Sequence, residues 1–380
     1  MRMGRVHRLL LAVALILGLS VLLTGGLSIY LTLAQVGDEN APTAEAMEPT
    51  LAPLATSEPR IAFVSDEEGD PAIYVMDADG SNRQRVSSQS EELCLFPSWS
   101  PDGNRVAFLG LSEGTGATVW VTDLDDSTPL PISHPVSDTS SQGLETLAPN
   151  WSFGGEQLAF VSLTDSANAA LQVAGADGSG VDHTIPLTGY VAVALRRSPV
   201  SERFLLVGSH QGGESNLYTV SVHSGGPTLI MTGTTAADWS PDGERIAVAE
   251  RVTKSVLVLE GDEEPRSVAQ FSTTPIDVRW SPDGSRMAVV TAGSERQGYG
   301  DALYVVDAES GEVTPLVDVE AWALWPAWSS DGARLLFTRG PLIRRAGLPY
   351  GDLWVYDTAS GDLGQLTARQ GFDGLGTWSP

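Results

Sequence analysis

Two short segments of the sequence contain the residue types of known chemical sites. Residues 110–114 read Gly-Leu-Ser-Glu-Gly and match the G-x-S-x-G pattern, in which a serine nucleophile stands between a strand and a helix. A strand-forming run at 117–121 follows, so we interpret the match as a hairpin loop. Residues 77–82 (Asp-Ala-Asp-Gly-Ser-Asn) hint at a calcium loop, but they lack the spaced ligands and closing glutamate of an EF-hand. We interpret them as a turn.

The other potential ligands do not follow the spacing of a metal site. The acidic segment at 66–70 is typical of a solvated loop, and the single cysteine, Cys94, lies in an apolar run that indicates a buried thiol. The histidines show no ligand spacing; they are His7, His134, His183, His210 and His223. We therefore predict no catalytic residue, no cofactor and no metal ion.

A basic and aromatic segment is a candidate for binding a partner protein. Residues 339–350 read Arg-Gly-Pro-Leu-Ile-Arg-Arg-Ala-Gly-Leu-Pro-Tyr, although the whole chain has a formal net charge of −26. Two tryptophans precede this segment, and arginine and aromatic residues are enriched in interface hot spots. The predicted contact residues are Trp322, Trp325, Arg339, Arg344, Arg345 and Tyr350. The alternative is that Trp325 belongs to the core and that the arginines pair with nearby acids.

A repeated motif indicates which elements would position these residues. The motif is Trp-Ser-Pro-Asp-Gly, and its complete and decayed copies begin at Trp99, Trp151, Trp239, Trp280, Trp328 and Trp378. One interval is twice as long as the others, which predicts a hidden copy near Arg197, where Arg-Ser-Pro replaces Trp-Ser-Pro. A period of 40 to 50 residues is typical of a repeat architecture.

Each repeat contains a turn and three further strand signals. Proline, aspartate and glycine in this order favour a tight turn between two strands. The first unit continues with strands at 61–64 and 73–77 and a weaker one at 85–87. The tryptophan ends the incoming strand, and its burial between neighbouring sheets would contribute roughly 4–6 kcal/mol as an upper bound.

Seven such sets predict an all-β fold, a seven-bladed β-propeller of four-stranded antiparallel blades. The first unit begins at its second strand, and the sequence ends just after a first strand at 375–378, so the C-terminal strand can complete the first blade. The motif turns would lie on one face. The longer loops, at 135–147, 291–301 and 339–351, would lie on the other, where we expect binding.

The repeat sequence resembles a known family. Units that read Trp-Ser-Pro-Asp-Gly, then Ile-Ala-Phe, then Ile-Tyr-Val-Met-Asp-Ala-Asp-Gly-Ser-Asn (73–82) are similar to the WD-repeat-like propeller repeats of the TolB family over residues 60–380. The resemblance implies an extracytoplasmic propeller that binds proteins. Similar repeats accompany the catalytic domain of prolyl-oligopeptidase-type peptidases, and we expect no second domain here.

The N-terminal segment predicts membrane attachment. We expect a basic cytoplasmic tail at 1–8, a transmembrane signal-anchor at 9–34 and a Pro/Ala/Thr-rich linker at 35–59, followed by the propeller at 60–380. A cleaved signal peptide, which would release a secreted form, is the alternative, although its apolar core is normally shorter. The acidic surface repels phosphate backbones, so nucleic acid is not an expected partner.

These features favour a single-pass membrane protein whose extracytoplasmic propeller is a protein-binding module or scaffold without catalysis of its own. The alternative is a propeller enzyme, such as a hydrolase or lyase, or a small-ligand sensor with its site in the central funnel. The sequence does not assign the residues that line this funnel.

Overall fold

The computed structural model describes residues 59–87, 93–112, 116–125, 128–133, 148–165, 168–223, 225–293, 302–316, 321–341, 351–369 and 371–380. Every helix or strand within these ranges is a strand. The described ranges contain no helix that could span a membrane. The predicted tail, transmembrane segment and linker up to residue 58 lie outside them.

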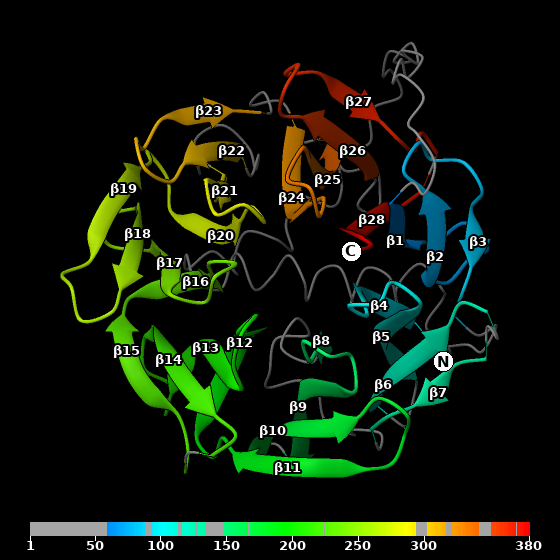
Figure 1. Ribbon diagram of the computed structural model, residues 1–380, viewed down its shortest axis with the longest axis horizontal. Coiled ribbons are helices and arrows are strands. Elements are labelled where there is room, and N and C mark those ends of the chain that lie inside the picture. Colours follow the sequence, from blue (N-terminus) through cyan, green and yellow to red (C-terminus); the bar gives the residue numbers. More distant parts are fainter. Residues whose placement is uncertain are drawn as a thin grey trace, which may run out of the picture.

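Twenty-eight strands form seven four-stranded antiparallel sheets around one axis (Figure 1). The innermost strands are β28 (Asp373–Trp378), β4 (Leu93–Trp99), β8 (Asn150–Trp151), β12 (Tyr190–Arg197), β16 (Thr234–Trp239), β20 (Pro275–Trp280) and β24 (Ala321–Trp328). The second strands are β1 (Arg60–Ser65), β5 (Arg105–Ser112), β9 (Gln157–Asp165), β13 (Arg203–His210), β17 (Arg245–Glu250), β21 (Arg286–Thr291) and β25 (Arg334–Pro341). In these two sets, blade 1 comes first and blade 7 last.

The outer half of each blade follows in the same blade order. The third strands are β2 (Ala72–Asp77), β6 (Gly116–Asp123), β10 (Asn168–Gly175), β14 (Ser215–Ser221), β18 (Ser255–Glu260), β22 (Ala302–Asp307) and β26 (Asp352–Asp357). The outermost strands are β3 (Gln84–Arg85), β7 (Leu130–Pro131), β11 (Val181–Pro186), β15 (Thr228–Thr232), β19 (Arg266–Gln270), β23 (Val313–Pro315) and β27 (Leu363–Gln365). The predicted seven-bladed propeller is confirmed, and the hidden copy at Arg197 is the end of the inner strand of blade 4.

The C-terminal strand closes the ring by completing blade 1. Strand β28 pairs with β1, with Trp378 opposite Ile61 and Asp373 opposite Ser65. Figure 1 shows the red β28 beside the blue β1. The Arg60 N–H also donates to Ser379 Oγ at 2.9 Å. This closure confirms the prediction and gives β1 an inner partner, so blade 1 has four strands.

The serine of the motif holds each complete turn together. In the blade 6 turn, Arg286 N–H donates to Ser281 Oγ at 2.9 Å, and the serine hydroxyl donates to Asp283 Oδ1 at 2.5 Å. Although burial opposes the effect, hydrogen bonds from Ser281 and Ser285 lower the pKa of Asp283 to about 2. Gly284 has a φ of 69°, which a residue with a Cβ rarely adopts. The motif is therefore a structural turn, as its residue types predict.

Arginine and tryptophan join neighbouring blades. At five junctions, the arginine that begins the second strand of one blade lies over the motif tryptophan of the next blade. The pairs and their guanidinium-to-ring distances are Arg60 and Trp99 (5.1 Å), Arg105 and Trp151 (4.9 Å), Arg203 and Trp239 (5.4 Å), Arg245 and Trp280 (4.8 Å), and Arg286 and Trp328 (5.4 Å). Each is a cation–π contact across a blade junction. We call this arrangement the arginine–tryptophan latch.

Candidate functional site

The chain order within a blade defines two faces of the propeller. Turns between the first and second strands lie on one face, which we call the motif face. Loops between the second and third strands, and the connections between blades, lie on the opposite loop face. Of the predicted partner-binding residues, Trp322 and Arg339 lie toward the loop-face side of blade 7, because β24 starts and β25 ends there, and Trp325 lies further along β24.

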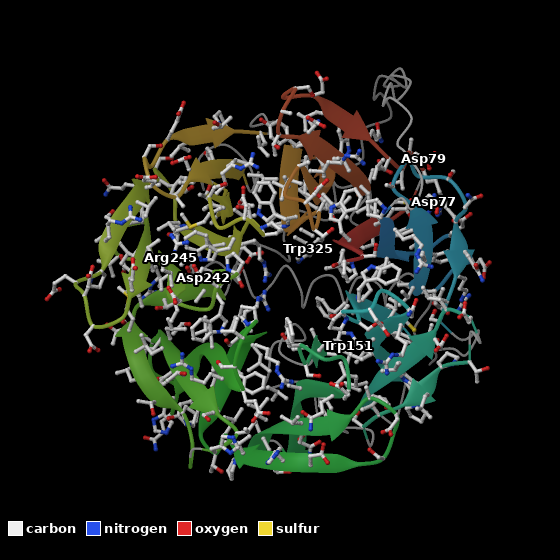
Figure 2. All side chains as sticks on the ribbon, viewed as in Figure 1. Asp77, Asp79, Trp151, Asp242, Arg245 and Trp325 are labelled. Atoms are coloured by element: carbon white, nitrogen blue, oxygen red, sulfur yellow. The ribbon has the colours of Figure 1, made fainter. Side chains whose placement is uncertain are left out.

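Three aromatic rings form a cluster in this part of blade 7. The Trp322 and Trp325 ring centroids are 6.3 Å apart, and the Trp325 and Phe372 centroids are 6.2 Å apart, both in edge-to-face geometry. Trp322 is buried, Phe372 is buried in the connection to blade 1, and Trp325 remains partly exposed. Figure 2 shows Trp325 on the inner side of its blade. The structure thus brings together the two predicted tryptophans and adds a phenylalanine that the sequence did not indicate.

Trp325 lies in a β-bulge with an unusual backbone conformation. The pairing of β24 with β25 shifts register between Leu324 and Ala327, and Trp325 has a φ of 55°. A non-glycine residue in the left-handed region costs on the order of 1–3 kcal/mol and often marks a functional position. Pro326, inside the strand, is the local signal that could have predicted the bulge.

Register shifts recur on the inner strands of other blades, and those at Phe96 and Leu375 share the positive φ of Trp325. The residues left unpaired at the register shifts include Phe96, Val193, Thr235, Ile276 and Leu375. Phe96 is also followed by a proline and has a φ of 53°. Phe96 is therefore the structural equivalent of Trp325 in blade 2.

Arg339 does not join the tryptophan cluster. Trp322 lies opposite Gly340 in the β24–β25 ladder, so the neighbouring Arg339 points to the other face of the sheet. Its guanidinium lies 4.7 Å from the centre of the Trp354 ring within the same blade. Arg344, Arg345 and Tyr350 fall outside the described residues. The predicted contact set therefore remains a prediction, with Arg339 separated from Trp322 by the sheet.

A network of charges lies beside the aromatic cluster, between blades 7 and 1. Arg83 contacts Asp373 at 3.2 Å and Glu67 at 3.3 Å. Arg369 lies 3.5 Å from Asp66 and 3.6 Å from the buried carboxylate of Asp373. Burial raises the pKa of Asp66 despite these partners. The network connects the start and the end of the propeller chain.

Asp352, at the start of β26, is a further half-buried carboxylate of this region. It accepts hydrogen bonds from the Arg369 N–H at 3.2 Å and from the Gln365 amide at 3.1 Å. Burial nevertheless raises its pKa to about 6, and the charge of Asp373 acts in the same direction. As the pH rises, Asp352 therefore loses its proton at a higher pH in the folded protein than in the unfolded chain.

Replacing Asp352 by asparagine should remove a pH-dependent loss of stability. Because the folded pKa is higher than the ordinary value, the contribution of Asp352 is fully present below about pH 4 and is lost as the pH rises through about 6. The pKa difference corresponds to about 3 kcal/mol, and solvent screening of this half-buried group reduces it to about 1–2 kcal/mol. We expect Asp352→Asn to match the native chain in urea unfolding at pH 4 and to exceed it by this amount at pH 7.5.

The exposed Asp362 of the same blade offers a matched control, because Asp362→Asn should leave the difference between the two pH values unchanged. An Asp352→Asn variant with the native pH dependence would contradict the assignment.

A second group of charges lies on the inner strands of blades 4 to 6. Asp238 accepts the Trp280 N–H at 3.0 Å, and Arg279 forms an ion pair with Asp277 at 3.2 Å. Burial raises the pKa of Asp238, while the charges of Arg279 and Arg196 lower it. In the described ranges, no three histidine, cysteine or acidic side chains are placed to hold a metal ion.

The two chemical motifs of the sequence are structural. Residues 110–112 end β5, and Ser112 pairs with Gly116 across the hairpin to β6, so the G-x-S-x-G segment has no helix after it. Residues 77–82 form the turn between β2 and β3, closed by the Gly80 N–H donating to Asp77 O at 2.9 Å. Cys94 is buried, as predicted.

Together, the closed ring, the repeated turn and the latch define a class: β-propellers assembled from Trp-Ser-Pro-Asp-Gly repeats. The family model of the TolB beta propeller domain (PD40) matches residues 55–277. The chain belongs to this family.

Individual relatives match over shorter stretches. The chain is 32% identical over 117 residues to the Tol-Pal system protein TolB of Desulfosudis oleivorans, which is 30% of this chain and 26% of that protein. The chain thus spans about a quarter of the length of this curated relative.

Solved structures share the fold at low sequence identity. The β-propeller domain of the Trilobed protease from Pyrococcus furiosus, described as having an open velcro topology, is 15% identical with a TM-score of 0.60, covering 83% of this chain and 98% of that chain. An oligogalacturonate lyase from Vibrio parahaemolyticus is 12% identical with a TM-score of 0.57, covering 82% and 86%. These likenesses establish the fold and leave the activity open.

Proposed function

We propose that this chain is an extracytoplasmic protein-binding module whose partner contacts the loop face of blade 7. The observation that carries the proposal is Trp325, a partly exposed tryptophan held at a φ of 55° between the rings of Trp322 and Phe372. The positive φ recurs at Phe96 and Leu375 and belongs to the bulge; the partly exposed indole supports the proposal, because tryptophan is enriched in interface hot spots. The curated relative is named a Tol-Pal system protein, which is consistent with a role in a protein assembly.

The N-terminal segment completes the proposal. Residues 9–34 would anchor the chain in the membrane, and the linker would hold the propeller away from the bilayer on the extracytoplasmic side. The charge network between blades 7 and 1 stabilises the sheet ends that carry Phe372, so it would support the binding surface rather than contact the partner.

Trp325→Asn should abolish partner binding without unfolding the propeller. Asparagine tolerates the left-handed backbone conformation but removes the aromatic contact area, so we expect affinity to fall by about 30-fold or more, as for an interface hot spot. The measurement is quantitative affinity capture by the full chain from the native envelope fraction, followed by a dissociation constant for the captured protein.

Phe96→Asn is the matched control, because Phe96 occupies the same bulge in blade 2 at almost the same φ. It should have a similar cost in stability and leave binding intact. The Arg344→Glu/Arg345→Glu double variant tests the neighbouring loop, and it should also lose the partner. Equal binding by the native chain and both blade 7 variants would contradict the proposal.

The enzyme and ligand-sensor alternatives depend on the inner-strand charges. Asp238 and Arg279 lie on the inner strands of neighbouring blades, where burial raises the pKa of the Asp238 carboxyl and the positive charge of Arg279 lowers it. If no protein is captured, and a small ligand binds the native chain but not an Arg279→Gln variant, the funnel rather than the loop face is the functional site.

A further inference from the structure

The arginine–tryptophan latch is absent at the junction between blades 3 and 4. Gln157 stands where the other blades have the arginine, and Arg197 stands where they have the tryptophan. Both neighbouring turns are decayed copies of the motif, since residues 152–155 read Ser-Phe-Gly-Gly and 198–201 read Ser-Pro-Val-Ser. Two neighbouring repeats have therefore lost the residues that fill their shared junction.

A pocket takes the place of the missing latch on the motif face. Its volume is about 450 Å³, and it is lined by the two decayed turns together with Gln157 and Arg197. Two apolar side chains in its lining are highly exposed, with Phe153 84% and Val200 61% accessible to solvent. Exposed apolar side chains gathered around a hollow are typical of a binding site.

Arg197 is the polar group of this pocket with unused hydrogen-bonding capacity. Its guanidinium lies 5.4 Å from the centre of the buried Phe204 ring, and its Nη1 is buried and donates no hydrogen bond to any described residue. In the intact latches of Arg60, Arg105 and Arg286, the guanidinium donates to a glycine carbonyl of the next turn at 2.7, 2.7 and 3.0 Å. A buried donor without an acceptor costs about 1–3 kcal/mol, so this junction lacks the hydrogen bond that stabilises those three latches.

We propose that the pocket between blades 3 and 4 binds an aromatic side chain of a basic segment of a partner polypeptide. The aromatic ring would stack with Arg197 and restore in trans the contact that an indole makes at the five latched junctions. A main-chain carbonyl of the same segment would accept a hydrogen bond from the Arg197 guanidinium.

The acidic residues in the lining of the pocket favour a positively charged partner segment. Glu156 and Glu202 are both exposed and both line the pocket, in a chain of net charge −26. Lysine or arginine beside the aromatic residue would pair with them, and acidic neighbours would be repelled. This pocket lies on the motif face, opposite the proposed partner surface of blade 7, so the two proposals can fail independently.

Short peptides test the proposal directly on the full chain. The probe is acetyl-Lys-Trp-Lys-amide with a 5-fluoro label on the indole, and its binding is followed by the broadening and shift of the fluorine resonance. Matched unlabelled peptides replace the indole by leucine or both lysines by glutamate, and their affinities are measured by competition against the labelled probe. We expect the native chain to bind the first peptide at least fivefold more tightly than either matched peptide.

Three variants locate the site. Arg197→Gln should weaken the probe about fivefold or more, because it removes the cation. The Gln157→Arg/Arg197→Trp double variant should abolish binding, since the chain would then fill the junction with its own latch, and its thermal midpoint reports that the fold is intact. Arg203→Gln is the control, because Arg203 stacks on Trp239 outside the pocket and should leave binding unchanged.

Retained binding by the double variant would overturn the proposal, and so would equal affinity for the tryptophan and leucine peptides. Equal binding of free acetyl-tryptophanamide would show that the site takes a small aromatic ligand and not a basic segment, and would overturn it as well.

Discussion

A chain that ends after Phe372 should no longer unfold as a single cooperative unit. The truncation removes β28, so β1 loses its inner partner and blade 1 keeps three strands. It also removes the carbonyl of Thr377, which accepts the Trp99 indole N–H at 3.2 Å and so joins blade 1 to blade 2. We expect the loss to be comparable with the whole free energy of unfolding of a domain, about 5–15 kcal/mol.

The truncation also removes the ion pairs of Asp373, so the expected loss of stability is larger than that from strand pairing alone. Asp373 is 1% exposed and is contacted by both Arg83 and Arg369, so its removal leaves each of these mostly buried arginines with fewer acidic partners. Removing one partner of a buried ion pair typically costs 3–5 kcal/mol.

Urea denaturation followed by tryptophan fluorescence measures the effect. Deletion of Pro380 alone is the control and should change little, because the exposed Pro380 lies beyond the strand. A synthetic peptide of residues 371–380, added in trans, should restore the cooperative transition by completing the sheet. A truncated chain with the native midpoint would show that blade 1 is stable with three strands.

The repeat made most of the fold predictable from the sequence. Trp-Ser-Pro-Asp-Gly fixes a turn through local chemistry alone, as the Ser281, Asp283 and Gly284 hydrogen bonds show. Runs rich in β-branched and aromatic residues after each turn then identify strands, and counting the units predicts seven blades. Even the copy at Arg197 could be placed, because the spacing of the intact copies left room for one more.

The site was less predictable because its contacts join residues far apart in the chain. Arg83 and Asp373 are separated by 290 positions, and neither has a local sequence feature that points to the other. Arg339 was grouped with the tryptophans because blade topology puts both connections on one face of the propeller, yet strand alternation directs its side chain to the opposite face of the sheet. The bulge at Trp325 was indicated only by the proline that follows it.

The arginine–tryptophan latch between blades 5 and 6 leads to the second prediction, which also concerns a large loss of stability. Trp280→Ala should lower the free energy of unfolding by about 3–5 kcal/mol, the usual cost of truncating a buried tryptophan. Trp280 is 6% exposed, and the Arg245 guanidinium lies 4.8 Å from its ring centre, so the substitution opens a cavity and also removes a cation–π contact. Urea unfolding at pH 7 measures the difference.

Substitution by phenylalanine distinguishes the contribution of the aromatic ring from that of the indole N–H group. The Trp280 indole nitrogen is buried with no acceptor among the described residues, whereas the Trp328 indole N–H donates to Arg279 O at 3.2 Å. Trp280→Phe keeps a ring under Arg245 and removes an unpaired donor, so we expect a loss of about 1 kcal/mol or less. Trp328→Phe removes the indole hydrogen bond and leaves the Arg279 carbonyl without that donor. We expect it to lower the free energy of unfolding by about 1 kcal/mol more than Trp280→Phe does. If the alanine and phenylalanine variants of Trp280 were equally destabilised, stacking on Arg245 could not be what holds these blades together.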